Sequence, residues 1–309
     1  MLEDFAHVIL TRFNLPSAGA ESYVRAKSGW LETRWELFER YCVPSVAMQT
    51  SREFRWIVYL DPDSPPWLKG RIAKVSSGGV FLPIYRAAVE RRQLVDDIRG
   101  VTGRAHQGLL TTNLDNDDAL AADFMERVED AATRVSGRHA IYLSVGLIKA
   151  GGAIYRRVDR SNPFCSVREG WDNPVTCWSD WHNLLGRSMP VLEVDGRPGW
   201  LQVIHGTNVS NRVRGRRVSP VGHRTTFGLA LDDIAPPGRI EIARDRVVDG
   251  PRRVLRETGR RAIKTVVIAT VGKSGLDRVK EFRLGKRTAS AVPRREQNAS
   301  FPKQGEPLG

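Results

Sequence analysis

Four consecutive polar side chains, Asp115, Asn116, Asp117 and Asp118, directly follow a β-prone run that ends at Leu114. Three carboxylates this close together repel one another unless a cation or the N–H groups of a helix end lie among them. An Asp-x-Asp at a strand end can hold Mg²⁺ or Mn²⁺ through one or two carboxylates and leave the other coordination positions to substrate phosphates. The first chemistry that this stretch indicates is therefore a divalent-metal site with Asp115 and Asp117 as ligands.

The same acidic run also has a structural interpretation, which stays open beside the metal site. Asp117 or Asp118 can cap a helix predicted over residues 119–135, because an Asp side chain accepts hydrogen bonds from the free N–H groups at a helix start. If both interpretations hold, Asp118 is the cap. A calcium-binding loop is excluded, since Ala119 and Leu120 replace its fifth-position ligand and its required Gly.

Strands and helices are predicted to alternate around this run. Apolar, β-prone runs predict strands over residues 5–13, 54–60 and 80–85, and one that ends at Leu114. Such alternation predicts an α/β fold in which ligands collect beyond the carboxyl ends of the strands.

The helices between the strands are predicted from the spacing of apolar residues. This spacing predicts helices over residues 30–48 and 67–75, with Pro44 bending or ending the first near Tyr41. Residues 89–99 fit either a charged helix or a charged loop.

Five polar side chains fall at or just beyond the ends of predicted strands: Arg12, Asp61, Asp63, Asp115 and Asp117. Since parallel strands end at a common sheet edge, these groups are expected to converge on one ligand. Ordinary turn chemistry is the alternative, because Asp is also a common turn residue.

The second half of the chain predicts a hairpin over residues 140–148 and 152–156, and a strand over residues 200–204 that ends before His205. A helix is predicted over residues 251–271, with Pro251 at its start. Four tryptophans gather in this half, which suits either a sugar-binding wall or core packing: Trp171, Trp178, Trp181 and Trp200.

Charge divides the chain unevenly. Of the 48 Lys and Arg residues, 23 lie after residue 211, together with only 10 of the 35 Asp and Glu residues, so this last third carries the whole net charge of +13. A basic region of this kind suits an anionic membrane, a nucleic acid or an acidic substrate, or is simply a solvated surface. Three cysteines without CxxC spacing, an acidic start and an apolar run at 266–271 too short to span a bilayer predict a cytoplasmic protein without a secretory signal.

The sequence lacks the motifs of several enzyme classes. No GxGxxG follows the first strand, and neither GxxxxGK[ST] nor GxSxG occurs, so dehydrogenase, P-loop and serine-hydrolase interpretations have no support. A strand-end Asp-x-Asp suits a nucleoside diphosphate donor, whose leaving pyrophosphate a divalent metal stabilises. The transfer also needs an Asp or Glu as the general base for the acceptor hydroxyl.

Six segments, in order along residues 5–211, resemble the family of putative rhamnosyltransferases. They are Leu10-Thr11-Arg12-Phe13-Asn14, Arg34-Trp35, Arg55-Trp56-Ile57-Val58-Tyr59-Leu60-Asp61-Pro62-Asp63-Ser64-Pro65, Leu114-Asp115-Asn116-Asp117-Asp118-Ala119-Leu120, Asn162-Pro163-Phe164 and Trp200-Leu201-Gln202-Val203-Ile204-His205-Gly206. The resemblance implies a GT-A glycosyltransferase with a Rossmann-like mixed sheet flanked by helices, a metal at Asp115-Asn116-Asp117 and a nucleotide-sugar donor. The family name points to dTDP-rhamnose.

The resemblance also implies roles for further residues. In GT-A enzymes a late histidine often completes the metal shell, and His205 matches it unless it is hydrogen-bonded in a turn. Asp180, in an acidic turn before a Leu-Leu-x-Arg helix, resembles the base of inverting enzymes, and a plain N-cap is its alternative. Glu169 is the second candidate base. Arg12 contacts the donor phosphates or pairs with Asp61, and Asn116, Asp61 and Asp63 join the donor site.

The sequence thus predicts an inverting, metal-dependent glycosyltransferase that transfers a sugar from a nucleoside diphosphate to an acceptor hydroxyl, on a lipid-linked or cell-envelope glycan. The predicted organisation is a GT-A domain at 1–211, a basic, partly helical extension at 212–286 and a disordered tail at 287–309. The extension is expected to contact an anionic membrane at its inner face, with no specific nucleic acid as partner. Two other functions stay open: nucleic-acid binding through the basic third, and a non-catalytic GT-A-like scaffold.

Overall fold

The computed structural model describes residues 5–16, 29–103, 106–205 and 212–258. The chain divides into a unit of residues 1–261 and a unit of residues 262–309, and everything described here belongs to the first. The predicted tail at 287–309 and the end of the helix predicted at 251–271 lie outside the described residues.

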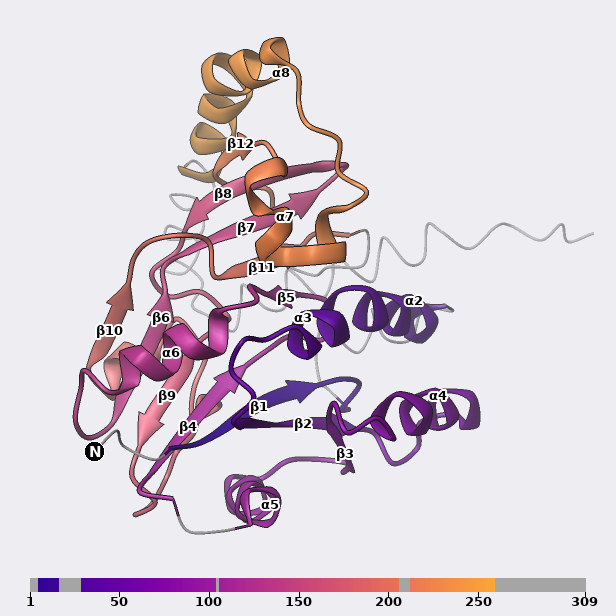
Figure 1. Cartoon of the computed structure of the whole chain (residues 1–309), viewed down its shortest axis with the longest axis vertical. Coiled ribbons are helices and arrows are strands. Elements are labelled where there is room, and N and C mark those ends of the chain that lie inside the picture. Colours follow the sequence, from indigo (N-terminus) through magenta and orange to yellow (C-terminus); the bar gives the residue numbers. More distant parts are fainter. Residues whose placement is uncertain (1–4, 17–28, 104–105, 206–211, 259–309) are drawn as a thin grey trace, which may run out of the picture. The chain divides into compact units, whose positions relative to one another are not determined.

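A seven-stranded mixed sheet, which we call sheet A, lies at the centre of the first unit, in the order β10-β6-β9-β4-β1-β2-β3 (Figure 1). Its strands are β1 (Phe5–Arg12), β2 (Phe54–Leu60), β3 (Leu82–Tyr85), β4 (Gly108–Asn113), β6 (His139–Leu143), β9 (Ser166–Glu169) and β10 (Val191–Val194). β3, β2, β1 and β4 are parallel, whereas β9 is antiparallel to both of its neighbours. The predicted α/β class, with a Rossmann-like mixed sheet flanked by helices, is confirmed.

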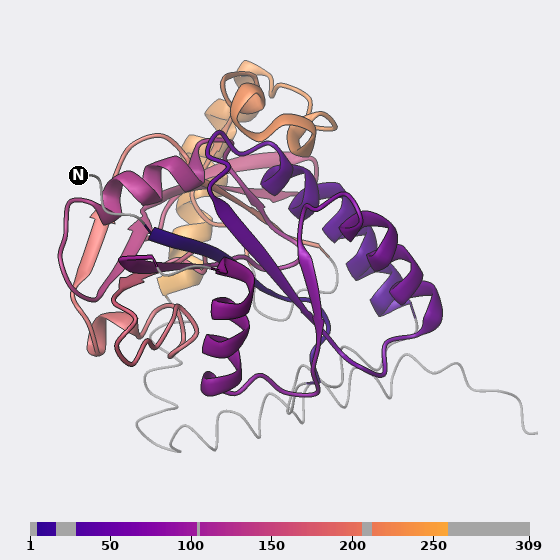
Figure 2. The same ribbon diagram turned by 60° about the horizontal axis from the view of Figure 1, so that its bottom comes forward.

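The alternation of apolar side chains along the strands gives sheet A two buried faces. Ile9 and Val58 belong to one core cluster, with side chains of α2, α4 and α6, whereas Val8 and Ile57 belong to a second, with side chains of α5. Successive side chains of a strand point to opposite faces, so neighbours in sequence reach different clusters. Figures 1 and 2 show α5 on the opposite side of sheet A from α2 and α6.

The helices begin and end close to where sequence patterns place them, with two exceptions treated below. They are α2 (Trp30–Leu37), the π-helical η1 (Phe38–Cys42), α3 (Val43–Ala47), α4 (Pro66–Ser76), α5 (Arg91–Thr102), α6 (Phe124–Ala132), α7 (Arg224–Phe227), α8 (Arg239–Arg244) and the π-helical η5 (Asp245–Asp249), with short 3₁₀ turns η2 (Leu185–Arg187), η3 (Val221–His223) and η4 (Gly228–Leu231). Residues 91–102 are therefore helical, which decides the alternative left open for 89–99. Among the described residues, no helix is long and apolar enough to cross a membrane.

Two prolines lie inside continuous helical runs, each two residues after a π turn. Pro44 follows η1 and Pro251 follows η5. A π turn already interrupts the regular hydrogen-bond ladder, so the missing proline N–H is tolerated there. The prediction that a helix starts at Pro251 is wrong, because helical residues begin at Arg239 and run to residue 258.

A second sheet, sheet B, has five strands in the order β12-β8-β7-β11-β5. They are β5 (Ala119–Leu120), β7 (Val145–Ala150), β8 (Ala153–Val158), β11 (Trp200–Val203) and β12 (Arg216–Val218). The predicted hairpin is present as β7 and β8, which pair antiparallel. The first half of its predicted first strand, however, is β6 of sheet A.

Trp200 on β11 is a core residue and not part of a sugar-binding wall. It is 2% exposed and stacks on Phe164, with ring centroids 5.1 Å apart. Gly146 on the neighbouring β7 leaves room for the indole, since a Cβ at Gly146 would lie 2.0 Å from the Trp200 ring.

The helix predicted over residues 119–135 is wrong at its start. Ala119 and Leu120 form β5, which pairs antiparallel with β11, and α6 begins only at Phe124. Burial of both residues against β11 overrides the helix propensity of Ala and Leu. Asp118 is therefore not the cap of this helix, as Asp123 holds that position.

Residues on both sides of the boundary predicted at residue 211 contribute to sheet B. β12 pairs with β8, and Phe227 and Leu231 are buried in the same core cluster as Ile9. The division of the chain at residue 211 stays a prediction.

Candidate functional site

The acidic run forms the loop that leaves sheet A after β4 and enters sheet B at β5. Several bonds fasten this loop to the end of β1. The Leu114 N–H donates to the Leu10 carbonyl (3.1 Å), and the Thr11 hydroxyl donates to the Leu114 carbonyl (2.8 Å). The buried Asn116 amide donates to the carbonyls of Arg12 and Phe13, at 2.9 and 2.5 Å. The loop is therefore fixed in place before any ligand binds.

The Asp117 carboxylate contacts two nitrogen-bearing side chains, Arg34 and His205. Its Oδ2 lies 2.5 Å from an Arg34 nitrogen of α2 and 2.8 Å from His205 Nε2, just beyond β11. Arg34 also donates to the Asn116 side chain (3.0 Å). Burial alone raises the pKa of Asp117, but the His205 hydrogen bond and the Arg34 charge outweigh it and hold the pKa below its usual value.

Asp118 is the most deeply buried of the three carboxylates, at 1% exposure. Its Oδ1 accepts the Val203 N–H of β11 at 2.8 Å, whereas its Oδ2 is buried without a hydrogen-bond partner. Burial, followed by repulsion from Asp117 and Asp115, raises the pKa of Asp118 well above its usual value. Asp118 thus joins the loop to β11 instead of capping a helix.

Asp115 is the exposed member of the run. The Asn113 amide donates to Asp115 Oδ1 at 3.3 Å. Although solvent reaches the side chain, protein surrounds it on most sides, and desolvation followed by repulsion from Asp117 raises the pKa of Asp115 to about 6. Its carboxylate is therefore available to a ligand and is poorly compensated by the protein alone.

These residues fit a divalent cation held together with a substrate. Within the described residues, no group of three or more His, Cys, Asp and Glu side chains is arranged to hold a metal ion. Mg²⁺ in nucleotide sites, however, needs only one or two carboxylates besides phosphates and water. Burial and mutual repulsion raise the pKa of Asp115 and of Asp118, so the protein alone disfavours their ionised forms, and a cation at Asp115 and Asp117 would favour ionisation there.

Arg12 lies at the end of β1, beside this loop. Its guanidinium lies over the Trp178 ring, 4.1 Å from the ring centroid. Trp178 in turn donates from its indole nitrogen to Asn113 Oδ1 (2.7 Å), the residue that contacts Asp115. The Arg12 charge is close enough to favour the ionised form of Asp115, which lowers its pKa.

Three residues beside the acidic loop were not expected at the donor site: Arg34, which had appeared only within the family resemblance, Trp178, expected in a sugar-binding wall or in the core, and Asn113. A signal was available for Arg34: it is three residues after Leu31 and four before Phe38, so a basic residue stands on the helix face expected to be apolar. No spacing indicated Trp178, because it lies in an irregular segment.

Asp61 and Asp63, at the end of the neighbouring β2, form a local turn. Asp61 Oδ1 accepts the Asp63 N–H (2.9 Å), and the Ser64 hydroxyl donates to the Asp61 carbonyl (2.6 Å). Asn14 holds this turn to the end of β1, since its Oδ1 accepts the Asp61 N–H (3.0 Å). Asp63 is exposed. The structure therefore accounts for the Asp61 carboxylate by turn chemistry, and a donor-binding role for either residue stays a prediction.

Asp180 is exposed and lies two residues after Trp178. Its Oδ1 accepts the N–H of Trp181 at 2.7 Å. Because Trp178 is hydrogen-bonded to Asn113, this segment is fixed beside the acidic loop. Asp180 is accessible to an acceptor there, and its role as base stays a prediction.

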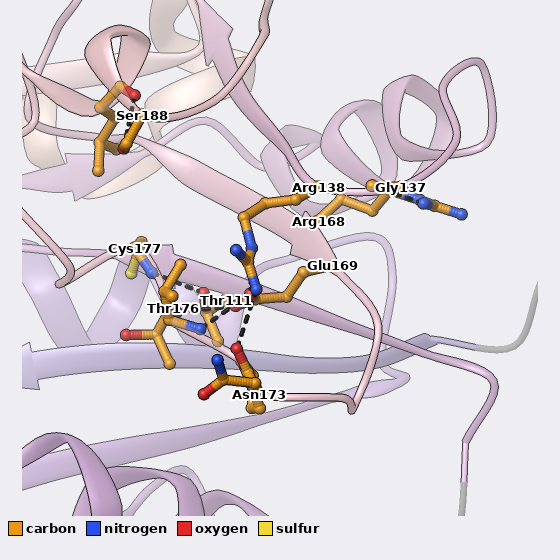
Figure 3. Close-up of polar contacts among 12 residues, drawn as sticks. Thr111, Gly137, Arg138, Arg168, Glu169, Asn173, Thr176, Cys177 and Ser188 are labelled. Atoms are coloured by element: carbon orange, nitrogen blue, oxygen red, sulfur yellow. Dashed lines mark hydrogen bonds and ion pairs between the residues drawn. The ribbon is translucent and has the colours of Figure 1, made fainter.

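Glu169 is buried on β9, and the structure gives it a structural role (Figure 3). Its carboxylate accepts the N–H groups of Val175 (2.9 Å) and Thr176 (2.7 Å) and a bond from Arg138 (2.9 Å). Glu169 pairs with Leu109 near the start of β4, so it lies at the opposite end of that strand from Asp115. With its side chain at 0% exposure, Glu169 does not reach an acceptor, and the geometry argues against it as a base.

The two hydrogen bonds that Glu169 accepts from the N–H groups of Val175 and Thr176 hold a strained turn. Thr176 has a φ of 66°, which is unusual for a β-branched residue, and Asn173 has a φ of 50°. The Cys177 N–H, next in the chain, donates to the Thr111 hydroxyl of β4 (2.9 Å). Glu169 thus fixes the segment that carries Trp178 and Asp180.

Comparison with solved structures gives only weak likenesses. TarS from S. aureus matches with 12% identity and a TM-score of 0.38, over 65% of this chain and 37% of TarS, and TarS 1-349 in complex with UDP matches with 13% identity and a TM-score of 0.38, over 65% of this chain and 60% of that one. A “putative nucleotide-diphospho-sugar transferase” from Desulfovibrio desulfuricans G20 matches with 8% identity and a TM-score of 0.34, over 66% and 82% of the two chains. The chain thus spans 37% and 60% of the two TarS chains.

No curated protein matches the sequence. Residues 6–217 match the family described as “Putative rhamnosyl transferase”, and this segment covers more than half of the chain. It contains the acidic loop, Arg12, Arg34, Asp180 and His205. The chain belongs to this family.

Proposed function

We propose that this protein is a glycosyltransferase that transfers a sugar from a nucleoside diphosphate donor to an acceptor hydroxyl in a metal-dependent, inverting reaction. One observation carries the proposal: an exposed carboxylate, Asp115, lies two residues from Asp117 in a fixed loop at the carboxyl end of a parallel strand. Ligands of open α/β sheets bind at this end of the strands.

Asp115 and Asp117 would hold the Mg²⁺ or Mn²⁺ ion together with donor phosphates and water. His205 is the proposed third ligand, and it would have to give up its 2.8 Å hydrogen bond to Asp117 to bind the ion, since the described side chains do not already form a three-ligand set. The ion supplies Lewis-acid stabilisation of the charge that develops on the leaving pyrophosphate. Arg34 keeps Asp117 ionised and in place through its 2.5 Å contact. The Arg12 guanidinium, held over Trp178, is placed to bind a donor phosphate, which suits its planar fork of N–H groups.

Asp180 is the proposed general base. An inverting transfer needs one carboxylate that takes the proton from the acceptor hydroxyl as the hydroxyl attacks the sugar. Asp180 is exposed and lies on the segment that Trp178 attaches to Asn113. A carboxylate at this place can meet an acceptor from solvent while the donor lies between it and Asp115.

The family description supports rhamnose as the sugar, and dTDP-rhamnose is the proposed donor. The proposed acceptor is a lipid-linked or cell-envelope glycan.

The test is a panel of nucleotide sugars that includes dTDP-rhamnose, with and without Mn²⁺, scored by donor hydrolysis and by thermal shift. We expect a metal-dependent response to at least one donor. Asp115→Asn and Asp117→Asn should abolish it, whereas Asp96→Asn, an exposed carboxylate on α5, should respond as the wild type does. No response to any donor with metal present would refute the proposed metal-dependent transfer.

A second measurement assigns the base and the stereochemistry. Asp180→Asn should keep donor and Mn²⁺ binding but lose transfer to an acceptor, and the anomeric configuration of the product should be opposite to that of the donor. Full transfer by Asp180→Asn, or a product of retained configuration, would contradict this part of the proposal.

A further inference from the structure

A helical run over residues 239–258 packs against β12 at the edge of sheet B (Figure 1, orange). It consists of α8, η5 and the helical residues that follow. The face of the run that packs toward β12, which we call the inward face, carries acidic side chains that pair with arginines. Glu241 pairs with Arg217 of β12 (3.0 Å), and Asp245 accepts the Arg217 N–H (2.9 Å). Nearer the end of the run, Glu257 pairs with Arg214 (2.6 Å).

Arg253 belongs to the same inward face. It pairs with Asp245 (2.7 Å) and donates to the Gly215 carbonyl (3.1 Å), and its guanidinium lies over the Tyr155 ring of β8. The inward face is therefore attached to sheet B mainly by ion pairs and hydrogen bonds and not by apolar contacts.

The apolar side chains of this run are exposed instead. Ile240 is 84% exposed, Val247 76%, Val254 66% and Leu255 76%. Such exposure of aliphatic side chains along one helical run is unusual in a protein that faces only water, and it indicates an interaction surface.

Four exposed arginines lie among these side chains: Arg239, Arg246, Arg252 and Arg256. Within the described part of the chain, none of the four has a carboxylate partner. Of the four acids of the run, three pair on the inward face and the fourth, Asp249, lies 3.4 Å from Arg244. The outward surface is thus both apolar and positively charged.

We propose that the outward surface of residues 239–258 docks on an anionic lipid bilayer, with Ile240, Val247 and Leu255 entering the headgroup boundary and the arginines contacting lipid phosphates. An amphipathic helix with aliphatic residues and arginines binds anionic membranes in this way. Each basic side chain near such a surface adds attraction. The docking does not depend on the donor site, and vesicle binding tests it without donor or acceptor.

Two other occupants fit the surface less well. A second copy of the chain would bring equal arginine clusters together, and the few aliphatic side chains fall short of the roughly 800 Å² per partner that stable interfaces bury. A nucleic acid would be bound through phosphate contacts, which leave three or four exposed aliphatic side chains without a role.

The full-length protein is tested by co-sedimentation with vesicles of phosphatidylcholine alone and with 30% phosphatidylserine, at low and high salt. We expect binding only to the anionic vesicles. Ile240→Ser/Val247→Ser/Leu255→Ser should weaken it at least tenfold, as should Arg239→Gln/Arg246→Gln/Arg252→Gln/Arg256→Gln.

The controls change exposed residues of the same types elsewhere, with the aliphatic ones exposed by 41–46%. They are Leu82→Ser/Val158→Ser/Val191→Ser and Arg71→Gln/Arg92→Gln/Arg134→Gln/Arg187→Gln, and both should bind as the wild type does. Circular dichroism shows whether each variant is folded. Equal loss in variant and control, or no vesicle binding by the wild type, overturns the proposal. Duplex RNA or DNA binding without vesicle binding overturns it in favour of a nucleic acid.

A fluorescent label locates the surface directly. Cys42, Cys165 and Cys177 are all buried, so a thiol introduced at the surface is labelled selectively. A polarity-sensitive dye on Val247→Cys should shift to the blue with anionic vesicles, whereas the same dye on Val191→Cys, on β10, should not. A blue shift of the Val247→Cys conjugate that rises with protein concentration without vesicles would identify a second copy as the occupant and overturn the membrane proposal.

Discussion

Two loops that follow parallel strands on either side of β1 carry the same pattern, Asp-x-Asp, and have different structures. The loop after β2 places Asp61 in a local turn and leaves Asp63 exposed. The loop after β4 buries Asp117, which contacts Arg34 and His205 from two distant parts of the chain. One carboxylate of the first loop satisfies its own backbone, whereas the carboxylates of the second are held by other elements and repel one another.

The difference shows that spacing alone does not identify a ligand site. A turn aspartate gains its partners from residues next to it, so it needs no ligand. In the β4 loop the three carboxylates are crowded, the pKa of Asp115 is raised to about 6 and one Asp118 oxygen is buried without a partner. Uncompensated charge at an exposed position, rather than the motif, separates the candidate site from the ordinary turn.

The largest expected contrast between the two loops is in activity. Asp117→Asn should lower kcat by roughly 10²–10³-fold, the usual loss when one stabiliser of transition-state charge is removed. Asp63→Asn should change kcat by no more than about twofold, because the Asp63 side chain is exposed at a turn. Initial rates with the responding donor at saturating Mn²⁺ measure both. Equal losses would show that the two loops act together.

Removal of Arg34 should mainly affect stability. Arg34 and Asp117 have side chains only 13% and 8% exposed, so Arg34→Met leaves a buried carboxylate without its main cation. We expect a loss of about 3 kcal/mol in the free energy of unfolding, as for other broken buried pairs. Urea unfolding measures it, with Arg92→Met as the exposed control. The double variant Arg34→Met/Asp117→Asn should lose less than the two single changes combined; additive losses would show that the pair is not coupled.

The affinity for metal should depend on pH through Asp115. Its pKa is raised to about 6, so below that pH the folded protein holds a proton that Mn²⁺ must displace. Titration calorimetry from pH 7.5 to 5 should show affinity falling as pH falls, by about tenfold per unit below pH 6 if one proton is displaced. Asp115→Asn should bind more weakly and with a flatter profile. A wild-type affinity that does not change over this range would remove Asp115 from the ligand set.

The smallest effects are expected in the β2 loop. Asp61→Ala removes one local hydrogen bond and should cost about 1 kcal/mol of unfolding free energy. Neither Asp61→Ala nor Asp63→Ala should change Mn²⁺ affinity. A drop in affinity comparable to that of Asp115→Asn would return these residues to the donor site.

The four parallel strands β1 to β4 of sheet A could be predicted from sequence because their apolar runs end in turn residues, whereas the short β9 and β10 gave no such pattern. The parallel order of β1, β2 and β4 then places Arg12, Asp61 and Asp115 at one sheet edge. The helix at residue 119 could not be excluded in this way, because only the pairing of Ala119 and Leu120 with the distant β11 makes them a strand. The place of Glu169 could not be predicted for the same reason, since pairing with Leu109 determines which end of β4 it reaches.

The partners of Asp117 illustrate what sequence patterns do not contain. The resemblance to putative rhamnosyltransferases implied a metal-site role for His205, which stays a prediction, and in the structure His205 lies 2.8 Å from Asp117. The contact of Arg34 with Asp117 was not expected, although Arg34 stands on the apolar face of its helix. Its contact depends on how α2 packs over the end of β1, which spacing within α2 does not determine.

The course of the acidic loop from sheet A to sheet B has a thermodynamic consequence. Asp115 follows β4, whereas Asp118 and His205 are held with β11, so separation of β5 from β11 would pull the candidate ligands apart. A donor bound here is therefore linked to the pairing of the two strands, and the coupling is reciprocal: the factor by which the donor stabilises the paired state is the factor by which pairing raises donor affinity. Hydrogen exchange at the Val203 amide reports this coupling. Bound donor should slow the exchange, because it stabilises the pairing of β5 with β11 in sheet B.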